Sequence, residues 1–336
     1  MIKKALICGV SGQDGAYLSK LLLEKDYQVY GGSRDAQASS FTNLKRLGIR
    51  DQIDVVSINI IDFRSTLQTI MKVKPEEIYN LAGQSSVGLS FEQPVETLES
   101  ISIGTLNLLE AIRFSGQPIK LYNAGSSECF GDTGEHKANE ETAFKPRSPY
   151  AVAKATAFWE VANYREAYNL FACTGILFNH ESPLRPARFV TQKIIGTAVR
   201  IYNGSREKLA LGNIEIERDW GFAPDYVEAM WLMLQQDIAD DFVISTGTTT
   251  SLREFIDITF NELGLKASEH IVINKDFMRP TDLKAGHSDP SKAFNKLGWK
   301  AKATLNDVIK CMIDSELLLS KTNLNDLEKV GSNSLI

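Results

Sequence analysis

A glycine-rich turn near the start of the chain restricts the fold more than any other feature. Residues 3–35 read "KKALICGVSGQDGAYLSKLLLEKDYQVYGGSRD". The apolar run "LIC" predicts a short strand, and Gly9, Gly12 and Gly15 in the spacing GxxGxxG predict a turn. The leucines that follow recur at helical spacing, and "QVY" begins a second strand. Because small residues let the backbone approach a pyrophosphate at a helix amino terminus, this order predicts a dinucleotide-binding turn.

Strand-like and helix-like segments continue to alternate after this turn. Strands are predicted in "IDVVSINIID", "EEIYNLAGQSS", "IKLYNAGSSE", "LFACTGILFNHESP" and "DDFVISTG", and long helices in "SIGTLNLLEAIRFSG" and "SPYAVAKATAFWEVANYREAY". This alternation predicts an α/β fold with a Rossmann-type, doubly wound parallel sheet. Ligands bind at the carboxyl ends of such strands. There the sequence places Asn59, Ser85, Ser126, Glu128 and Asn179.

The sequence becomes less regular after Pro183 and carries several basic residues. We therefore expect a dinucleotide-binding domain in residues 1–180, to which residues 223–262 return. A smaller α/β substrate-binding domain is expected from residues 181–222 and 263–325, closing over an anionic substrate. The polar residues 326–336 are expected to form a flexible tail.

Composition excludes several classes of function. The net charge of −5 gives no basic face for nucleic acid. No apolar run approaches the roughly 20 residues that span a bilayer, and the basic start breaks at glycine too soon for a signal peptide. The four cysteines are scattered, without a CxxC pair or a histidine at metal-ligand spacing. We therefore expect a reduced, cytoplasmic protein without a metal site or a membrane partner.

The residues that follow the second strand bear on the choice of nicotinamide cofactor. About 20 residues beyond such a turn, an acidic side chain selects NAD and a basic one NADP. This window holds Ser33, Arg34 and Asp35. Asp35 could bind a ribose diol, whereas Arg34 and Ser33 could hold a 2′-phosphate. Because the arginine comes first after the strand, the sequence favours NADP, and NAD stays open.

Tyr150 and Lys154 form the only YxxxK pair in the chain. Residues four apart on a helix share a face, so an ammonium is expected beside a phenol. That charge would lower the pKa of the phenol and let Tyr150 exchange a proton near neutral pH. The pair opens a helix one loop after Ser126 and Glu128, which favours chemistry over an exposed surface pair.

Together, the glycine turn, Ser126 and the Tyr-Lys pair resemble the extended short-chain dehydrogenase/reductases. Longer matches resemble one branch of them, the GDP-mannose 4,6-dehydratase family, over nearly the whole chain. This resemblance implies NADP as a recycled cofactor, GDP-mannose as substrate, and a homodimer or homotetramer. The matching segments include "GVSGQDGAYLSKLLLEKDY", "NLAGQSSVGLSFEQP", "PRSPYAVAK", "NYREAY", "GILFNHESP", "FVTQKI", "RDWG" and "DYVEAMWLMLQQ".

The resemblance also implies which residues contact the ligands. For the cofactor they are Gly9, Val10, Ser11, Gly12, Gln13, Asp14, Gly15, Arg34, Asn59, Ile60, Leu81, Ala82, Gly83, Gln84, Ser85, Lys154, His180 and Arg185. For the substrate they are Ser85, Ser126, Asn179, Lys193, Arg218 and Arg279. Three positions depart from the family pattern. Asn59 stands where an Asp is usual, Asp35 where a second Arg is frequent, and Ser126 where a Thr is usual.

Glu128 distinguishes between the reactions that this family of folds carries out. An alcohol dehydrogenase or a 4-epimerase needs only the serine, tyrosine and lysine. A 4,6-dehydratase also needs a base that removes the proton from C5 while the C6 hydroxyl leaves. The predicted catalytic set is therefore Ser126, Glu128, Tyr150 and Lys154. A GDP-heptose dehydratase, a GDP-4-keto-6-deoxy-sugar reductase and a non-catalytic nucleotide-binding regulator stay open as alternatives.

Overall fold

The computed structural model describes residues 2–332, and its centre is a seven-stranded sheet in which every pairing is parallel. The strand order is β11-β6-β5-β4-β1-β2-β3, so the order reverses between β1 and β4. This is the doubly wound topology that the sequence predicts. The strands are β1 Lys4–Cys8, β2 Gln28–Ser33, β3 Asp54–Ser57, β4 Glu77–Asn80, β5 Lys120–Ala124, β6 Ala172–Leu177 and β11 Phe242–Ile244.

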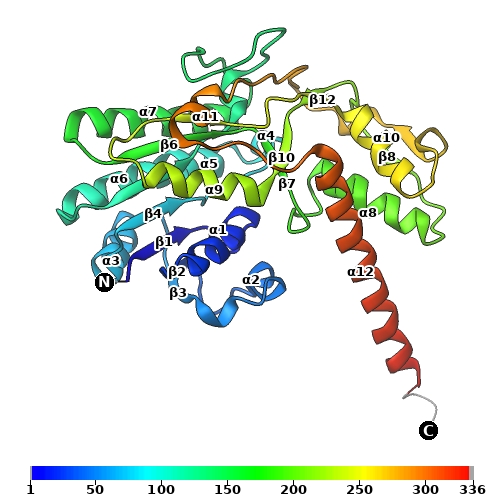
Figure 1. Cartoon of the computed structure of the whole chain (residues 1–336), viewed down its shortest axis with the longest axis horizontal. Helices are drawn as coiled ribbons and strands as arrows, with labels where there is room; N and C mark the ends of the chain where they lie inside the picture. The colour runs from blue at the N-terminus through cyan, green and yellow to red at the C-terminus, as the bar shows by residue number, and fades with distance from the viewer. Residues whose placement is uncertain (1, 333–336) are drawn as a thin grey trace.

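Helices cover both faces of the sheet because successive strand residues point to opposite faces. Ala5 and Ile7 of β1 pack with α1, α9 and α11, whereas Leu6 and Cys8 pack with α3, α6 and α7. Figure 1 shows α1 and α9 side by side along the sheet. The helices of this layer are α1 Gln13–Glu24, α2 Thr42–Arg46, α3 Phe63–Val73, α4 Val87–Glu92, α5 Pro94–Leu98, α6 Gly104–Ser115, α7 Pro149–Tyr168, α9 Ala223–Leu234 and α11 Ser291–Leu297.

A second apolar core lies beside the sheet, where α8, α10 and α12 meet (Figure 1). Its elements are α8 Val190–Tyr202, α10 Leu252–Glu262, α12 Leu305–Ser332, β8 Leu209–Leu211 and β13 Ile271–Ile273. Three short strands, β7 Asn179–Glu181, β9 Glu217–Arg218 and β10 Trp220–Phe222, together with β12 Thr250–Ser251, join the two cores. No helix in the described part of the chain is long and apolar enough to cross a membrane.

The packing differs from the expected division of the chain at two places. Helix α10 was expected to return to the sheet, but Phe255 and Phe260 are buried in the second core. Conversely, Leu297 and Trp299 pack with the sheet core, although residues 263–325 were expected to leave it. The pattern of apolar residues in a sequence shows which face of a helix is buried, but it does not show which other elements that face packs against. The expected tail begins inside α12, and residues 333–336 lie outside the described residues.

Glu160 on α7 gives the fold a pH dependence. Its Oε2 atom is buried and has no hydrogen-bond partner among the described residues. Burial raises the pKa of Glu160 to about 7. Because this folded pKa is above the ordinary value of 4.5, the native state keeps a proton that the unfolded chain releases. Ionisation of Glu160 therefore lowers the free energy of unfolding as the pH rises through about 4.5 to 7.

We expect Glu160→Gln to raise the free energy of unfolding at pH 8 by about 1–2 kcal/mol, with solvent screening taken into account. At pH 4 the variant and the parent should unfold alike, since both are then neutral at this position. Urea denaturation at the two pH values measures the difference. Glu166→Gln, an exposed position on the same helix, is the matched control. An equal gain at both pH values would contradict the assignment.

Candidate active site

The three glycines of the first turn have different structural reasons to be glycine. Gly9 has a φ of +88°, and a Cβ there would lie 2.7 Å from the Leu81 carbonyl oxygen. A Cβ at Gly15 would lie 2.5 Å from the Gly9 oxygen, so this position permits the helix to pack closely on the strand. Gly12 is exposed, and its nearest neighbour would be the Gly9 oxygen at 3.4 Å. Protein packing alone therefore does not require glycine at position 12.

Gly12 lies at the amino terminus of α1, where backbone N–H groups and the helix dipole favour an anion. A methyl group at this position would fill the space that a pyrophosphate needs. We expect Gly12→Ala to weaken the binding of a nicotinamide dinucleotide at least about tenfold, with an unchanged melting temperature. Calorimetric titration and thermal unfolding measure the two effects. Gly196→Ala is the control, because a Cβ there has a similar clearance of 3.4 Å. If Gly12→Ala binds the cofactor as tightly as the parent does, the pyrophosphate does not bind at this turn.

The side chains of Gln13 and Asp14 point into the protein. Gln13 accepts a hydrogen bond from Ser182 Oγ at 2.7 Å and donates to the His180 oxygen at 3.1 Å. His180 Nε2 lies 2.9 Å from Asp14 Oδ2. Although burial opposes both charges, their attraction raises the pKa of His180 and lowers that of Asp14. These predicted cofactor residues therefore fasten the start of α1 to β7 and the segment after it.

At the end of β2, Asp35 is engaged by its own loop. Its Oδ1 atom accepts the N–H groups of Gln37 and Ala38 at 2.9 and 3.0 Å. These hydrogen bonds lower the pKa of Asp35. Arg34 is exposed, and no side-chain partner for it occurs within residues 2–321. The structure therefore favours Arg34 over Asp35 as the residue that is available to a ligand, because no carboxylate pairs with Arg34.

Ser126, Tyr150 and Lys154 converge where β5 ends. Ser126 begins a short 3-10 helix, Ser127–Phe130, by accepting the N–H of Glu128 at 3.3 Å, and it also hydrogen-bonds to Tyr150. The Ser148 hydroxyl caps α7 by accepting the Ala151 N–H at 3.1 Å, which places Tyr150 in its first turn. Lys154, one turn later, donates to the Ala124 oxygen at 2.6 Å.

The expected lowering of the Tyr150 pKa is wrong for this structure. Burial raises the pKa of Tyr150, and the hydrogen bond with Ser126 only partly offsets it. Lys154 Nζ is 5.9 Å from the centre of the Tyr150 ring and is directed to the Ala124 carbonyl. Burial also lowers the pKa of Lys154 to about 8. The helical spacing correctly places both groups on one face, but it carries no information on burial.

Glu128 lies two residues after Ser126, and charged side chains from the far end of the chain act on it electrostatically. Burial raises the pKa of Glu128, Arg218 and Arg279 lower it, and Asp282 raises it. Arg218 is only 7% exposed, and its Nη2 atom lies 3.4 Å from Asp282 Oδ1. Arg279 Nη1 lies 3.6 Å from the same oxygen. The sequence interpretation missed Asp282, although its place three residues after Arg279 is a spacing at which side chains meet.

Three other predicted contacts have partners within the protein. Lys193 is directed away from the cluster, with Nζ 2.7 Å from the Ala210 oxygen and over the Phe277 ring. Arg185 pairs with Glu181 at 3.0 Å. Ser85 accepts a hydrogen bond from Arg188, a residue that the sequence interpretation did not select, at 3.2 Å.

The remaining predicted cofactor positions occur in two segments. Asn59 follows β3, and its backbone N–H and C=O are bound by Ser65 and Thr66. Ile60 is buried against α6. The segment 81–85 follows β4, and Gly83 has a φ of +122°. Asn179 lies on β7, paired with Trp220. Within residues 2–321, none of these residues forms a hydrogen bond or an ion pair with Ser126 or Tyr150.

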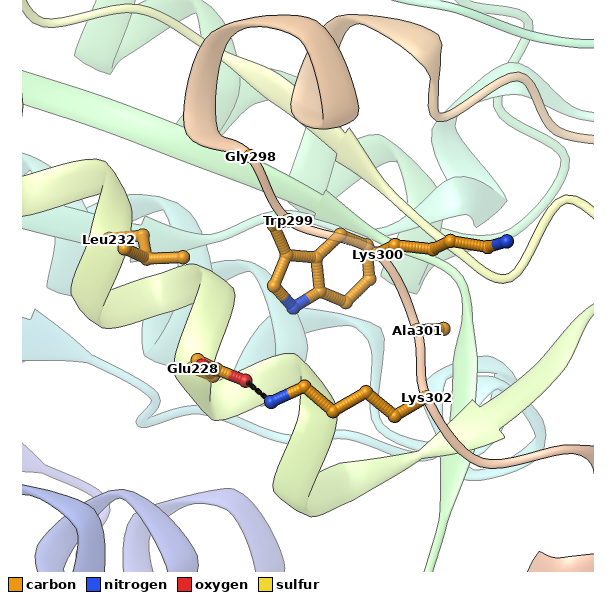
Figure 2. A pocket seen from close by; sticks show the side chains of 7 residues that line it. All are labelled: Glu228, Leu232, Gly298, Trp299, Lys300, Ala301 and Lys302. Carbon is orange, nitrogen blue, oxygen red and sulfur yellow. Dashed lines mark hydrogen bonds and ion pairs between the residues drawn. The ribbon is translucent and has the colours of Figure 1, made fainter.

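A surface hollow of about 380 Å³ lies away from these residues. Figure 2 shows the Trp299 indole between α9 and residues 298–302, with Lys302 paired to Glu228. None of its lining residues belongs to the predicted site. Within residues 2–332, no group of three His, Cys, Asp or Glu side chains could hold a metal ion.

The doubly wound fold is shared with solved structures that contain a nicotinamide cofactor. A dTDP-glucose 4,6-dehydratase from Bacillus anthracis, solved with NAD, superposes with a TM-score of 0.82 at 20% identity, covering 93% of this chain and 96% of that one. RMD from Pseudomonas aeruginosa, complexed with NADPH, superposes with a TM-score of 0.79 at 21% identity, covering 94% and 98%. These likenesses establish the fold.

Sequence comparison defines the family. The family described as GDP-mannose 4,6 dehydratase matches residues 6–312. GDP-mannose 4,6 dehydratase 1 of Arabidopsis thaliana is 46% identical over 333 residues, which cover 95% of this chain and 91% of the relative. The chain belongs to the GDP-mannose 4,6-dehydratase family.

Proposed function

We propose that this protein is a GDP-mannose 4,6-dehydratase, a hydro-lyase that converts GDP-mannose to GDP-4-dehydro-6-deoxy-mannose and water. The observation that carries the proposal is the buried Glu128 carboxylate, which follows the Ser126–Tyr150 pair at one strand end and whose pKa two arginines lower. Oxidation at C4 needs only a hydroxyl-binding pair, whereas elimination across C5 and C6 needs a base. The family and its named relatives support the same reaction.

The proton transfers follow from the positions of the side chains. Tyr150, held by Ser126, takes the proton of the C4 hydroxyl as C4 is oxidised to a ketone. The ketone acidifies C5, and Glu128 removes that proton and returns it to the departing C6 hydroxyl, which leaves as water. The proton held by Tyr150 then reaches C5, which balances the reaction. A raised pKa suits Glu128 to both its steps, since a base that must later act as an acid works best near the operating pH.

The glycine turn and the ends of β2 and β4 would hold the cofactor. The nicotinamide held there would supply reversible hydride transfer, and the positive charge of its oxidised ring would favour the phenolate of Tyr150. We propose NADP rather than NAD, because Arg34 is exposed without a carboxylate partner while Asp35 caps its own loop. Lys154 would bind the nicotinamide ribose.

The substrate would bind between the two cores. Arg218 and Arg279 would supply the positive charge that a diphosphate requires. One guanidinium group can donate two parallel hydrogen bonds to the oxygens of a phosphate. Both face Glu128, so the diphosphate would lie close to the sugar carbons that react. Asn179, Ser85 and Lys193 complete the proposed substrate contacts, and Lys193 would have to turn from the Ala210 carbonyl.

We also propose a cytoplasmic homo-oligomer. Cys8, Cys129, Cys173 and Cys311 are all free, as in a reducing compartment. A homodimer is supported by apolar side chains that stay exposed on α5, on α7 and on the π-helical turn Glu99–Ile103 that follows α5. These side chains are Val95, Leu98, Ile103, Val152 and Trp159. Sedimentation analysis distinguishes a dimer from a tetramer.

Mass spectrometry of GDP-mannose incubated with the protein and catalytic NADP tests the proposed reaction. We expect a product that is lighter by one water and no net accumulation of NADPH. A parallel incubation with NAD should give a much slower conversion. An unchanged sugar, in a preparation that binds NADP, would contradict the proposal. A stoichiometric consumption of added NADPH would identify a reductase instead.

A further inference from the structure

Residues 282–288, which include Asp282, run directly past the segment that follows Glu128. Asp132 accepts two backbone N–H groups of that loop, from Lys284 to Oδ2 at 3.2 Å and from Ala285 to Oδ1 at 3.0 Å. Next to it, the Thr133 hydroxyl accepts the His287 N–H at 2.9 Å. Further along, Ala138 N–H donates to the His287 oxygen at 2.9 Å. The two segments are about 150 residues apart in sequence, so this contact is purely tertiary.

The other side of the same loop is held by the strand that carries Arg218. Glu217 exchanges backbone hydrogen bonds with Lys284 and Gly286 at 2.7 and 3.1 Å. Arg218 Nη1 donates to the Leu283 oxygen at 2.9 Å. The loop therefore lies between Asp132, four residues after Glu128, and the arginine that faces Glu128.

The turn before Asp132 is fixed by its own geometry. Gly131 has a φ of +72°, and a Cβ there would collide with the Lys145 carbonyl oxygen. The short 3-10 helix that carries Glu128 ends at this glycine. The backbone therefore fixes the position of Asp132 relative to Glu128. Because the Asp132 carboxylate hydrogen-bonds to the loop, it also fixes the position of the loop relative to Glu128.

We propose that Asp132 is a positioning residue, which sets the separation between Glu128 and the Arg218–Asp282–Arg279 cluster by holding the loop 282–287. This inference rests on the proposed function, in which those two arginines bind the diphosphate. Asp132 itself touches neither the substrate nor the cofactor in this proposal. Its role is distinct from that of Asp282, which contacts both arginines directly.

Two consequences follow if the loop is released. The arginines lose their fixed place, so the nucleotide sugar should bind more weakly. Their charges also lower the pKa of Glu128, so their displacement should raise it. Because a carboxylate acts as a base only when it is ionised, a higher pKa of Glu128 should move the acid limb of the pH–rate profile to a higher pH.

Asp132→Asn is the test, because an amide keeps the shape but has one acceptor oxygen for two N–H groups. We expect KM for GDP-mannose to rise about tenfold, and the acid limb of kcat/KM to move up by about half a pH unit. NADP affinity should stay unchanged. Hydrogen exchange at the amides of Lys284 and Ala285 should accelerate. Asp307→Asn is the matched control, since Asp307 also accepts a backbone N–H but lies on α12.

Some outcomes would overturn the inference. Faster exchange with an unchanged KM and acid limb would reduce Asp132 to a purely structural contact, and unchanged exchange would show that it does not hold the loop. If Asp132→Asn does not fold, Thr133→Val, which removes the neighbouring hydrogen bond, is expected to give the same changes to a smaller degree. If the parent does not convert GDP-mannose, the proposed function fails. Titration with free GDP then tests the loop alone, and equal GDP affinity in parent and variant would overturn the positioning role.

Discussion

Glu128→Gln is expected to stop the loss of water while NADP stays bound. The amide has the size of the carboxylate but cannot take the C5 proton, and a positioned general base contributes roughly 10²–10⁴-fold to a rate. Oxidation at C4 depends on Tyr150 and should survive. A single turnover should therefore accumulate a 4-ketone that keeps its C6 hydroxyl, detectable by mass spectrometry after trapping the ketone with borodeuteride.

The control for this variant is Glu262→Gln, at an exposed position on α10. It removes the same charge and should leave turnover unchanged. Turnover of Glu128→Gln at the rate of the parent would contradict the assignment of Glu128 as the base. A variant that no longer forms the ketone at all would place Glu128 earlier in the reaction than we propose.

Tyr150→Phe is expected to block the reaction one step earlier, by about 10²–10⁴-fold in kcat. The ring still fits its cluster of Ile101, Ala153 and Ala157, so the fold should be retained. Without the phenolic oxygen, the C4 hydroxyl has no group to take its proton. Neither the 4-ketone nor a reduced nicotinamide should appear in a single turnover, in contrast to Glu128→Gln.

Tyr202→Phe on α8 is the matched control, because this side chain is 54% exposed. Formation of the ketone by Tyr150→Phe at the parental rate would move the proton transfer to another group. The two active-site variants together separate oxidation from elimination, since each should stop at a different, identifiable species.

Much of the sheet and of the site could be predicted from the sequence because the responsible patterns are local. Gly9 and Gly15 indicate a turn between strand and helix, and the structure shows the close backbone contacts that exclude a side chain at both. Tyr150 and Lys154 share a helix face through their spacing alone. Alternating strands and helices determine a parallel, doubly wound sheet because parallel strands require crossover connections.

The partners of these side chains were decided only by the tertiary structure. The family resemblance implied that Gln13 and Asp14 contact the cofactor, and the structure shows that their side chains bind Ser182 and His180 from β7 and the segment after it. Helical spacing predicted a lowered pKa for Tyr150, whereas burial raises it. Arg218, Arg279 and Asp282 meet Glu128 across about 90 residues or more of chain. Local sequence sets backbone conformation, but desolvation and charge contact depend on which distant segments pack together.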